Sequence, residues 1–158
     1  MINFGRIETD IFVGSAPQSS VDVARLSQMK INAVLSLQSD MDFQTHQIDW
    51  KKVKMAYAHN RIEVERYAII DFDETDVAKH LAKPVNALNN LLTQKRRVYV
   101  HCNAGISRAP ATVLAYLCHF RGMSVDEGLK YIRLNRPQAY PYIKAVEKVL
   151  DDLKNPVA

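Results

Sequence analysis

One stretch, residues 98–110, constrains the fold more than any other part of the chain. Residues 98–100 (Val-Tyr-Val) are of types that favour β-strands, and Gly105 permits backbone conformations closed to other residues. Pro110 suits the first turn of a helix, where its missing amide hydrogen would be unpaired in any case. The stretch therefore predicts a strand, a tight loop and a helix N-terminus. The amides of such a loop converge, and the helix dipole adds positive charge, so that an anion can be held there.

A cysteine and an arginine add chemistry to this predicted anion site. Cys102 stands at the base of the loop, where amides, the helix N-terminus and Arg108 would favour the nucleophilic thiolate near neutral pH. The planar fork of Arg108 can clamp two oxygens of a phosphoryl group. Nucleophile and electrophile would then be held together, which predicts a phosphatase acting through a cysteinyl-phosphate. The predicted phosphate-binding residues are Asn103, Ala104, Gly105, Ile106, Ser107 and Arg108.

The pattern His101-Cys102-x-x-Gly105-x-x-Arg108 resembles the signature of the cysteine-dependent protein tyrosine phosphatase superfamily. Ala104-Gly105 and the short length make the chain more similar to the dual-specificity branch. This resemblance implies a single catalytic domain over residues 1–158 with an α/β fold, in which helices flank a central, mostly parallel sheet of about four to five strands. It also implies that His101 supports the loop and tunes the thiolate rather than transferring protons.

Composition agrees with one compact enzyme. A chain of 158 residues suits a single domain, and 47% hydrophobic with 24% charged residues is ordinary globular usage. No apolar run approaches the roughly 20 residues of a membrane span, and the N-terminus lacks a signal-peptide pattern. The excess of 21 Lys+Arg over 17 Asp+Glu suits an anionic substrate. We expect a monomer without nucleic-acid or stable membrane partners, in the cytoplasm or, if a transit peptide has been removed, in a reducing organelle such as a plastid.

The two cysteines do not predict a disulfide. Ten residues of helix beyond Arg108 would carry Cys118 about 15 Å along the axis, whereas bonded Cα atoms lie within roughly 7 Å. We therefore predict that Cys118 is a core residue and that the compartment is reducing. The remaining histidines, which show no metal-ligand spacing, are His46, His59, His80 and His119. The sequence predicts a reaction with no metal and no other cofactor, because Arg108 and the loop amides supply the charge stabilisation.

Short β-rich runs alternate with helical patterns, which favours a layered α/β fold. The predicted strands cover residues 11–13, 33–37, 64–70 and 98–100. The predicted helices run from 19 or 20 to about 29, within 42–58 as one or two segments, from a Ser124/Glu127 capping box to about 135, and from 142 to about 153. A further helix capped by Asp76 would carry one apolar face of Val77, Leu81, Val85, Leu88 and Leu92.

Cleavage of a phosphate ester also needs an acid for the leaving oxygen. The acidic cluster at residues 71–76 directly follows a predicted strand, and a loop at a strand's carboxyl end opens toward the ligand crevice of α/β proteins. In the family that the chain resembles, the general acid lies on such a loop about thirty residues before the nucleophile. Asp71 fits this position, and Asp73 and Asp76 are the alternatives.

The substrate class is indicated by a finer resemblance. The segment Arg108-Ala-Pro-Ala111 is similar to plant glucan phosphatases that dephosphorylate starch, where most relatives carry Ser or Thr in place of Ala109. Residues 13–18, 32–38 and 71–73 correspond in the same order, so the resemblance covers about residues 11–146. Two features depart from it. Ser107 stands where the glucan enzymes usually have Gly, and the chain carries no appended carbohydrate-binding module.

Three hypotheses follow. The first is a phosphatase for phosphorylated glucan, favoured by Ala109. The second is a dual-specificity phosphatase for Ser/Thr/Tyr phosphoproteins, favoured by Ser107, and the third is a non-enzymatic phosphate-binding module. Sugar rings stack on aromatic faces, and Phe72 and Tyr140 are the candidates for a substrate groove. Trp50 and Tyr57 suit either the groove or the core. We predict a phosphatase and favour the glucan over the phosphoprotein substrate.

Overall fold

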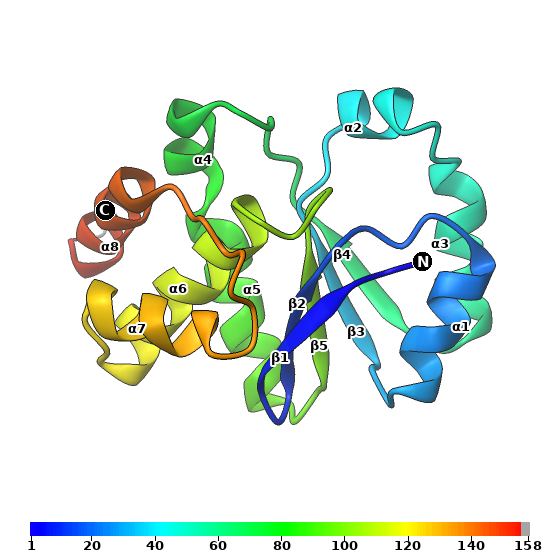
Figure 1. Ribbon diagram of the computed structural model, residues 1–158, viewed down its shortest axis with the longest axis horizontal. Coiled ribbons are helices and arrows are strands. Elements are labelled where there is room, and N and C mark those ends of the chain that lie inside the picture. The colour runs from blue at the N-terminus through cyan, green and yellow to red at the C-terminus, as the bar shows by residue number, and fades with distance from the viewer. Residues whose placement is uncertain (156–158) are drawn as a thin grey trace.

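A five-stranded sheet runs through the centre of the computed structural model, which describes residues 1–155 (Figure 1). The strands are β1 (Phe4–Glu8), β2 (Ile11–Gly14), β3 (Ala33–Ser36), β4 (Glu63–Arg66) and β5 (Val98–His101). Their spatial order is β1-β2-β5-β3-β4, with β1 antiparallel to β2 and all other neighbours parallel. The predicted mostly parallel sheet is thus confirmed. Of the predicted domain 1–158, residues 156–158 lie outside the described part.

Helices cover both faces of the sheet. They are α1 (Ser20–Gln28), α2 (Asp40–Thr45), α3 (Trp50–His59), α4 (Glu74–His80), α5 (Ala82–Thr93), α6 (Arg108–Arg121), α7 (Val125–Arg133) and α8 (Ile143–Lys154). Figure 1 shows α1 and α3 on one side of the sheet and α4 to α8 on the other, with α2 beyond the end of the strands. The flanking helices of the predicted fold are therefore present on both faces.

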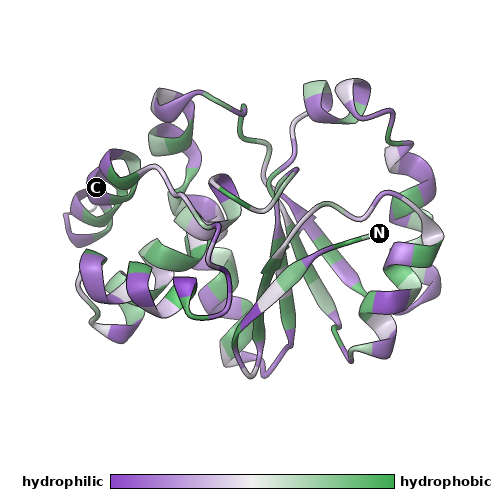
Figure 2. Ribbon diagram, viewed as in Figure 1, coloured by the Kyte–Doolittle hydropathy of each residue, from purple (hydrophilic) through white to green (hydrophobic). Residues whose placement is uncertain are grey.

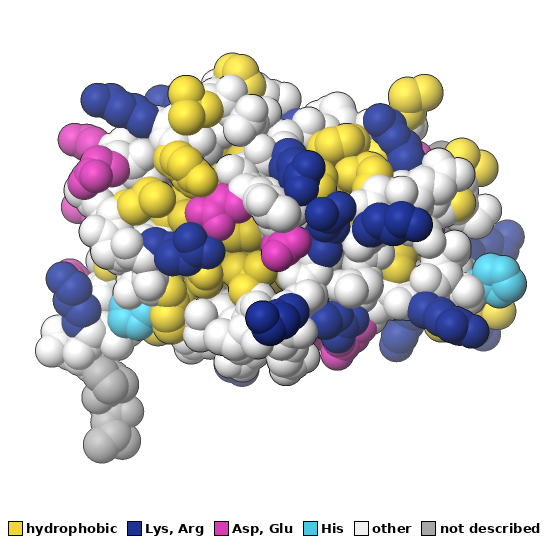
Figure 3. Space-filling view, turned by 90° about the horizontal axis from the view of Figure 1, so that it is seen from below, with side chains coloured by type: hydrophobic (Ala, Val, Ile, Leu, Met, Phe, Trp, Pro, Cys, Tyr) yellow, Lys and Arg dark blue, Asp and Glu magenta, His cyan; other side chains and the backbone are white. Residues whose placement is uncertain are grey.

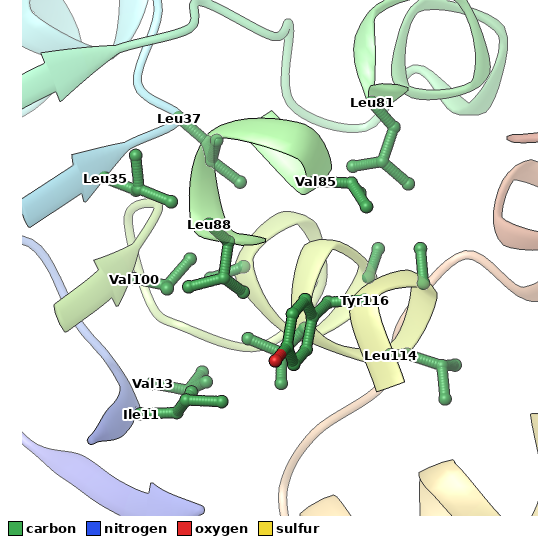
Figure 4. Close-up of a cluster of buried hydrophobic side chains, with 14 of the residues drawn as sticks. Ile11, Val13, Leu35, Leu37, Leu81, Val85, Leu88, Val100, Leu114 and Tyr116 are labelled. Atoms are coloured by element: carbon green, nitrogen blue, oxygen red, sulfur yellow. The ribbon is translucent and has the colours of Figure 1, made fainter. Parts of the chain in front are cut away.

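The core lies in two apolar clusters, one on each face of the sheet. Successive strand residues point to opposite faces, so Val98 and Val100 enter the cluster beneath α5 and α6 while Tyr99 enters the cluster beneath α1 and α3. Figure 4 shows the first cluster, where Val100 and Leu88 lie close to residues of α6, and Figure 2 shows mostly hydrophobic residues along the central strands. Because β5 is buried on both faces, its carboxyl end is a rigid base for the loop that follows.

Two strand predictions need correction. Residues 64–70 do not form one long strand, since β4 covers only Glu63–Arg66 beside β3. The chain continues as a loop, whose amides donate two hydrogen bonds to the neighbouring segment: Tyr67 N to Ser36 O at 2.9 Å and Ile69 N to Leu37 O at 3.2 Å. The strand β1 was not predicted, and it extends the sheet by pairing with β2.

The prediction of a single helix capped by Asp76 is wrong. The apolar stripe belongs to two helices, α4 and α5, that meet at Leu81. Pro84 has no amide hydrogen and its ring clashes with the carbonyl four residues earlier, so one helix cannot continue through this point. The N-cap of α4 is Asp73, whose Oδ1 accepts a hydrogen bond from the Asp76 amide at 3.0 Å. The stripe itself is present, since Val77, Leu81, Val85 and Leu88 are buried and Leu92 is half-buried.

The other helices agree with the sequence within one to three residues. Ser19 caps α1, and Ser124 and Glu127 form the predicted capping box of α7. The mixed segment 42–58 forms two helices, α2 and α3, and α8 begins one residue after the predicted start. The helices α1, α2, α3 and α7 each begin after a residue whose side chain caps them, which explains the agreement there, whereas α8 begins without a side-chain cap.

The charges are spread over the surface. Figure 3 shows lysine and arginine side chains distributed over the face seen from below, with apolar and a few acidic side chains between them. The formal net charge of the chain is +4. A net positive charge attracts anions at long range without selecting among them. None of the helices within residues 1–155 combines the length and apolar character that a bilayer crossing needs.

Candidate active site

The predicted loop connects the central strand to the most buried helix. Strand β5 ends at His101 and α6 begins at Arg108, so residues 102–107 lie between a strand's carboxyl end and a helix N-terminus. Strands β2 and β3 flank β5 on either side, which places the loop at the middle of the sheet edge. In α/β folds ligands bind at such edges. The arrangement is the strand, loop and helix that the sequence predicts.

The carbonyl groups of residues 103–106 accept hydrogen bonds from elements around the loop. The buried side chain of Arg136 donates from Nη2 to Ala104 O at 2.8 Å and from Nε to Gly105 O at 3.0 Å. The Ala16 amide donates to Asn103 O at 2.9 Å, and the Tyr140 amide donates to Ile106 O at 2.7 Å. With its carbonyls held by these donors, the loop keeps its amides available to an anion.

Gly105 is required by the shape of this loop. Its φ is 70°, in the left-handed region that residues with a Cβ rarely adopt. A Cβ at this position would also collide with the backbone of Gly14 and with the side chain of Arg136. The predicted role of Gly105 in the tight turn therefore has a backbone and a packing reason.

Cys102 lies at the base of the loop and is buried. Cys118 is half-buried in α6, and both thiols are free. Burial, followed by the charge of Glu127, raises the pKa of Cys118, so its thiol stays protonated at neutral pH. Cys118 is therefore an unreactive thiol packed against the core, and Cys102 is the thiol at the start of the loop.

Arg108 is buried, and its guanidinium nitrogens differ in whether they donate a hydrogen bond within the protein. Nη1 donates to Ile69 O at 2.7 Å and to Asp42 Oδ2 at 2.7 Å. Within the described chain, Nε and Nη2 have no hydrogen-bond partner. Unpaired buried donors are costly, and two adjacent ones match two oxygens of a phosphoryl group. The site can therefore bind a tetrahedral oxyanion next to Cys102.

Asp71 faces this arginine. Its Oδ2 lies 3.3 Å from Arg108 Nη2, a distance that gives electrostatic attraction although the groups are not aligned as a hydrogen bond. The two alternative acids are engaged elsewhere, because Asp73 caps α4 and Asp76 binds the Ile70 amide at 2.8 Å. The position supports Asp71 over the alternatives, and its role as general acid stays a prediction.

His101 is buried directly before the cysteine. Its Nδ1 lies 2.9 Å from the Cys102 carbonyl, and since a carbonyl only accepts, Nδ1 carries the proton. Burial lowers the pKa of His101 to about 4 against the favourable effect of this hydrogen bond, and the charge of Arg108 lowers it further. The imidazole is therefore neutral at pH 7 and holds the loop's first carbonyl, in agreement with a supporting role.

Because His101 is buried in its neutral form, the free energy of unfolding is expected to depend on pH. Between pH 6.5 and about 4 the unfolded chain binds a proton at this histidine that the folded chain does not, so stability falls as the pH falls. The free energy of unfolding, measured by urea titration, should drop by roughly 2 kcal/mol more between pH 7 and pH 4.5 in the wild type than in His101→Gln. His59→Gln, at an exposed site, should behave like the wild type. Equal slopes for His101→Gln and the wild type would contradict this account.

The structure separates the aromatic candidates. Phe72 is 90% exposed and lines a cavity of about 450 Å³ beside the loop, together with Met41 and Ile70. Tyr140 is 73% exposed and lines a different cavity of about 470 Å³ with Tyr142. The two rings therefore do not share one cavity.

Trp50 and Tyr57 belong to the core rather than to a groove. Trp50 stacks on Phe43 with ring centroids 5.1 Å apart, and Tyr57 is buried. Both pack in the apolar cluster on the α1 and α3 side of the sheet. Of the two interpretations that the sequence left open for these rings, the structure supports the core.

Three side chains at the site were missed by the sequence analysis. Asp42 and Gln38 hold the Asn103 side chain, with Asn103 Nδ2 donating to Asp42 Oδ1 at 2.7 Å and Gln38 Nε2 donating to Asn103 Oδ1 at 2.8 Å. Arg136 holds the loop carbonyls. The pattern Ser39-x-x-Asp42 signals a helix start, and it does form the capping box of α2. No local pattern indicates that the same carboxylate reaches Arg108.

The described residues do not gather metal ligands. No group of three or more His, Cys, Asp or Glu side chains within residues 1–155 has the arrangement of a metal site. His80, one of the scattered histidines, pairs with Asp76 at 3.3 Å along α4. The charge on a bound phosphate would be met by Arg108 and the loop amides. A reaction without metal stays a prediction.

Comparison with protein families and curated proteins gives a consistent result. Residues 11–152 match the family model described as "Dual specificity phosphatase, catalytic domain". The chain is 30% identical over 154 residues to the amyloplastic phosphoglucan phosphatase DSP4 of Castanea sativa, covering 96% of this chain and 41% of that protein. It is 34% identical over 131 residues to the chloroplastic phosphoglucan phosphatase LSF1 of Arabidopsis thaliana, covering 83% and 22%. The chain thus spans less than half the length of these relatives.

The fold agrees with solved structures. The crystal structure of PTPMT1 superposes with a TM-score of 0.78 over 96% of each chain, at 19% sequence identity. At this identity the similarity concerns the fold alone. The resemblance drawn from residues 101–108 and the predicted fold class are both confirmed.

Proposed function

The chain belongs to the dual-specificity phosphatase family, and on that premise we propose that it hydrolyses phosphate monoesters of a phosphorylated glucan through a cysteinyl-phosphate. One observation carries the chemistry. Arg108 holds two unpaired, buried donors beside the loop that begins at Cys102, with Asp71 3.3 Å from one of them. These contacts support a site in which a nucleophile, an oxyanion clamp and an acid act on the same phosphate, as phosphoryl transfer requires.

In the first step, the Cys102 thiolate attacks phosphorus in line with the ester oxygen. An S–P bond forms, the P–O ester bond breaks, and Asp71 gives its proton to the leaving alcohol oxygen. The loop amides and the Nε and Nη2 groups of Arg108 hold the three remaining oxygens, whose charge is spread in the transition state. Positioning and electrostatic stabilisation therefore account for most of the catalysis.

In the second step, water attacks the phosphorus of the cysteinyl-phosphate. The Asp71 carboxylate takes a proton from this water, the P–S bond breaks, and the thiolate and inorganic phosphate are released. Ala109 lacks the hydroxyl that, in most members of the family the chain resembles, assists this step. Water and Asp71 would therefore complete the step without it.

The glucan substrate is supported by the relatives and by Phe72. The two curated relatives described above, from Castanea sativa and Arabidopsis thaliana, are named phosphoglucan phosphatases. Phe72 has a φ of 59° and is almost fully exposed beside the site, so the chain accepts a costly backbone conformation without burying the ring. A ring held outward in this way can stack on the apolar face of a sugar. Tyr140 is the second proposed contact, from its separate cavity.

The second candidate substrate is a phosphoprotein. Ser107 favours it, as does the family description, which names dual specificity. The cavity beside Phe72 is lined in part by apolar side chains that would also accept a peptide side chain. The chemistry of Cys102, Arg108 and Asp71 is the same for both substrates, so only substrate preference separates them.

Phosphate release from solubilised phosphoglucan and from a phosphopeptide panel, measured side by side, tests the proposal. We expect a higher kcat/KM on glucan, and Phe72→Ala should lower it roughly 3- to 10-fold because a stacking contact is lost. Phe72→Tyr, which keeps the ring, should retain the glucan activity. Cleavage of a small aryl phosphate should be unchanged in both variants.

The controls distinguish the outcomes. Cys102→Ser serves as the blank, and Phe120→Ala removes a partly exposed ring at the far end of α6. Preferential release from the peptides would reject the glucan substrate and favour the phosphoprotein phosphatase. Activity on the aryl phosphate alone would reject both substrates and keep the chemistry.

Location and assembly are further parts of this proposal. The two curated relatives are named amyloplastic and chloroplastic, which supports a plastid over the cytoplasm. The two free cysteines suit a reducing compartment of either kind. That the protein acts as a monomer stays a prediction, which light scattering would measure.

A further inference from the structure

A single carboxylate, that of Asp42, contacts both parts of the phosphate site. Its Oδ2 accepts hydrogen bonds from Arg108 Nη1 at 2.7 Å and from the Ser39 amide at 2.7 Å. Its Oδ1 accepts one from Asn103 Nδ2 at 2.7 Å. Asp42 is buried in the first turn of α2, about sixty residues before the loop. The catalytic arginine and the residue after the proposed nucleophile are therefore joined through one side chain.

All the hydrogen bonds that Arg108 donates from its guanidinium start at Nη1, whereas the Asp71 carboxylate lies 3.3 Å from Nη2 without an aligned hydrogen bond. Nη1 donates hydrogen bonds to Asp42 Oδ2 and Ile69 O, and a longer one of 3.4 Å to Leu37 O. Nε and Nη2 are left unpaired within residues 1–155. The two carbonyls are neutral, whereas a carboxylate makes the stronger, charge-assisted bond. Among the three acceptors of Nη1, Asp42 therefore makes the strongest bond, and it holds the guanidinium with Nε and Nη2 free of hydrogen bonds to the described residues.

The charge state of Asp42 suits this task. Burial raises its pKa, but the hydrogen bond and charge of Arg108, with the bonds from Ser39 and Asn103, outweigh burial and hold the pKa below its ordinary value. The carboxylate is therefore ionised at neutral pH. A buried ion pair of this kind is weak evidence for stability, since desolvation offsets much of its attraction. Its geometric role is the more specific consequence.

We propose that Asp42 is a positioning residue, which holds Arg108 with Nε and Nη2 turned to the phosphate and keeps Asn103 aligned at the start of the loop. The inference rests on the proposed phosphatase chemistry and names a residue beyond the nucleophile, clamp and acid. Asn103 is held from its other side by Gln38, so the chain Gln38–Asn103–Asp42–Arg108 connects the loop to α2. The loss of the charge on Asp42 would release the arginine without removing any group that touches the substrate.

The test compares two changes of the same kind on one helix. Asp42→Asn removes the charge that faces Arg108, while Asp40→Asn removes an exposed charge two residues earlier that pairs with Arg66 at 3.1 Å. We expect Asp42→Asn to lower kcat/KM for an aryl phosphate by roughly 10- to 100-fold, by analogy with the loss of groups that orient the ligands of metal sites. Asp40→Asn should match the wild type.

A double-mutant cycle separates positioning from a general effect on folding. Arg108→Lys removes the planar fork, so Asp42→Asn should add little further loss in that background. An equally large additional loss would show that Asp42 does not act through Arg108 and would overturn the proposal. So would an Asp42→Asn enzyme that keeps wild-type kcat/KM.

Binding of inorganic phosphate keeps the test independent of turnover. In a Cys102→Ser background, Asp42→Asn should weaken phosphate binding by a similar factor, measured by calorimetry, and Asp40→Asn should not. If the wild type cleaves no phosphate ester, the proposed function fails, and this binding comparison still decides the role of Asp42. If Asp42→Asn does not fold, nitrogen NMR of the wild-type Arg108 side chain decides instead. Distinct Nη signals indicate a held guanidinium, and averaged signals would overturn the proposal.

Discussion

Replacing Cys102 by serine is expected to lower phosphate release by on the order of 10⁴-fold or more while phosphate still binds. The serine hydroxyl is a far weaker nucleophile at neutral pH than a thiolate. The groups that hold the anion are untouched, because Arg108 and the loop amides do not depend on the sulfur. Release of nitrophenol from nitrophenyl phosphate measures the first effect, and calorimetry with inorganic phosphate measures the second.

The matched control is Cys118→Ser, the same chemical change at a half-buried thiol of α6. It should keep the wild-type rate, since Cys118 packs against the core away from the loop. A radiolabelled phosphoenzyme should be trapped on acid quench in the wild type and in Cys118→Ser. Appreciable turnover by Cys102→Ser would reject the proposed nucleophile.

Asp71→Asn is expected to slow cleavage of alkyl phosphates by roughly 10²- to 10⁴-fold, the usual contribution of a general acid. An alkoxide is a poor leaving group and needs the proton, whereas a nitrophenolate leaves without it. The loss should therefore be much smaller for the aryl ester. The measurement is kcat for a series of phosphate esters whose leaving groups span a wide range of acidity.

The control for Asp71 comes from the same acidic cluster. Asp73→Asn removes a carboxyl group but keeps the cap of α4, because asparagine caps helices as well as aspartate does. Its activity should be close to that of the wild type on every ester. Equal losses for aryl and alkyl esters in Asp71→Asn would move the acid to another residue.

Much of the candidate site could be predicted because its chemistry is contiguous in the chain. Cys102, Gly105 and Arg108 lie within seven residues, and a buried strand followed by a helix N-terminus sets their geometry locally. The acidic loop was also predicted, although the strand expected directly before it ends at Arg66. Its details were not: α4 begins three residues earlier than expected, with Asp73 as its cap, and Asp76 binds the Ile70 amide. Asp71 is left facing the arginine.

The sequence by itself determined the α/β class, the strand–loop–helix unit and the reactive pair Cys102 and Arg108, because each depends on neighbours along the chain. Only the tertiary structure decided how the site is held. Asp42, Ile69 and Arg136 reach the loop and its arginine from segments about thirty to sixty residues away, through contacts that only packing creates. Local patterns report backbone preferences and burial. They carry no record of which distant acceptor meets which nitrogen of Arg108, and that choice leaves two donors free for a phosphate.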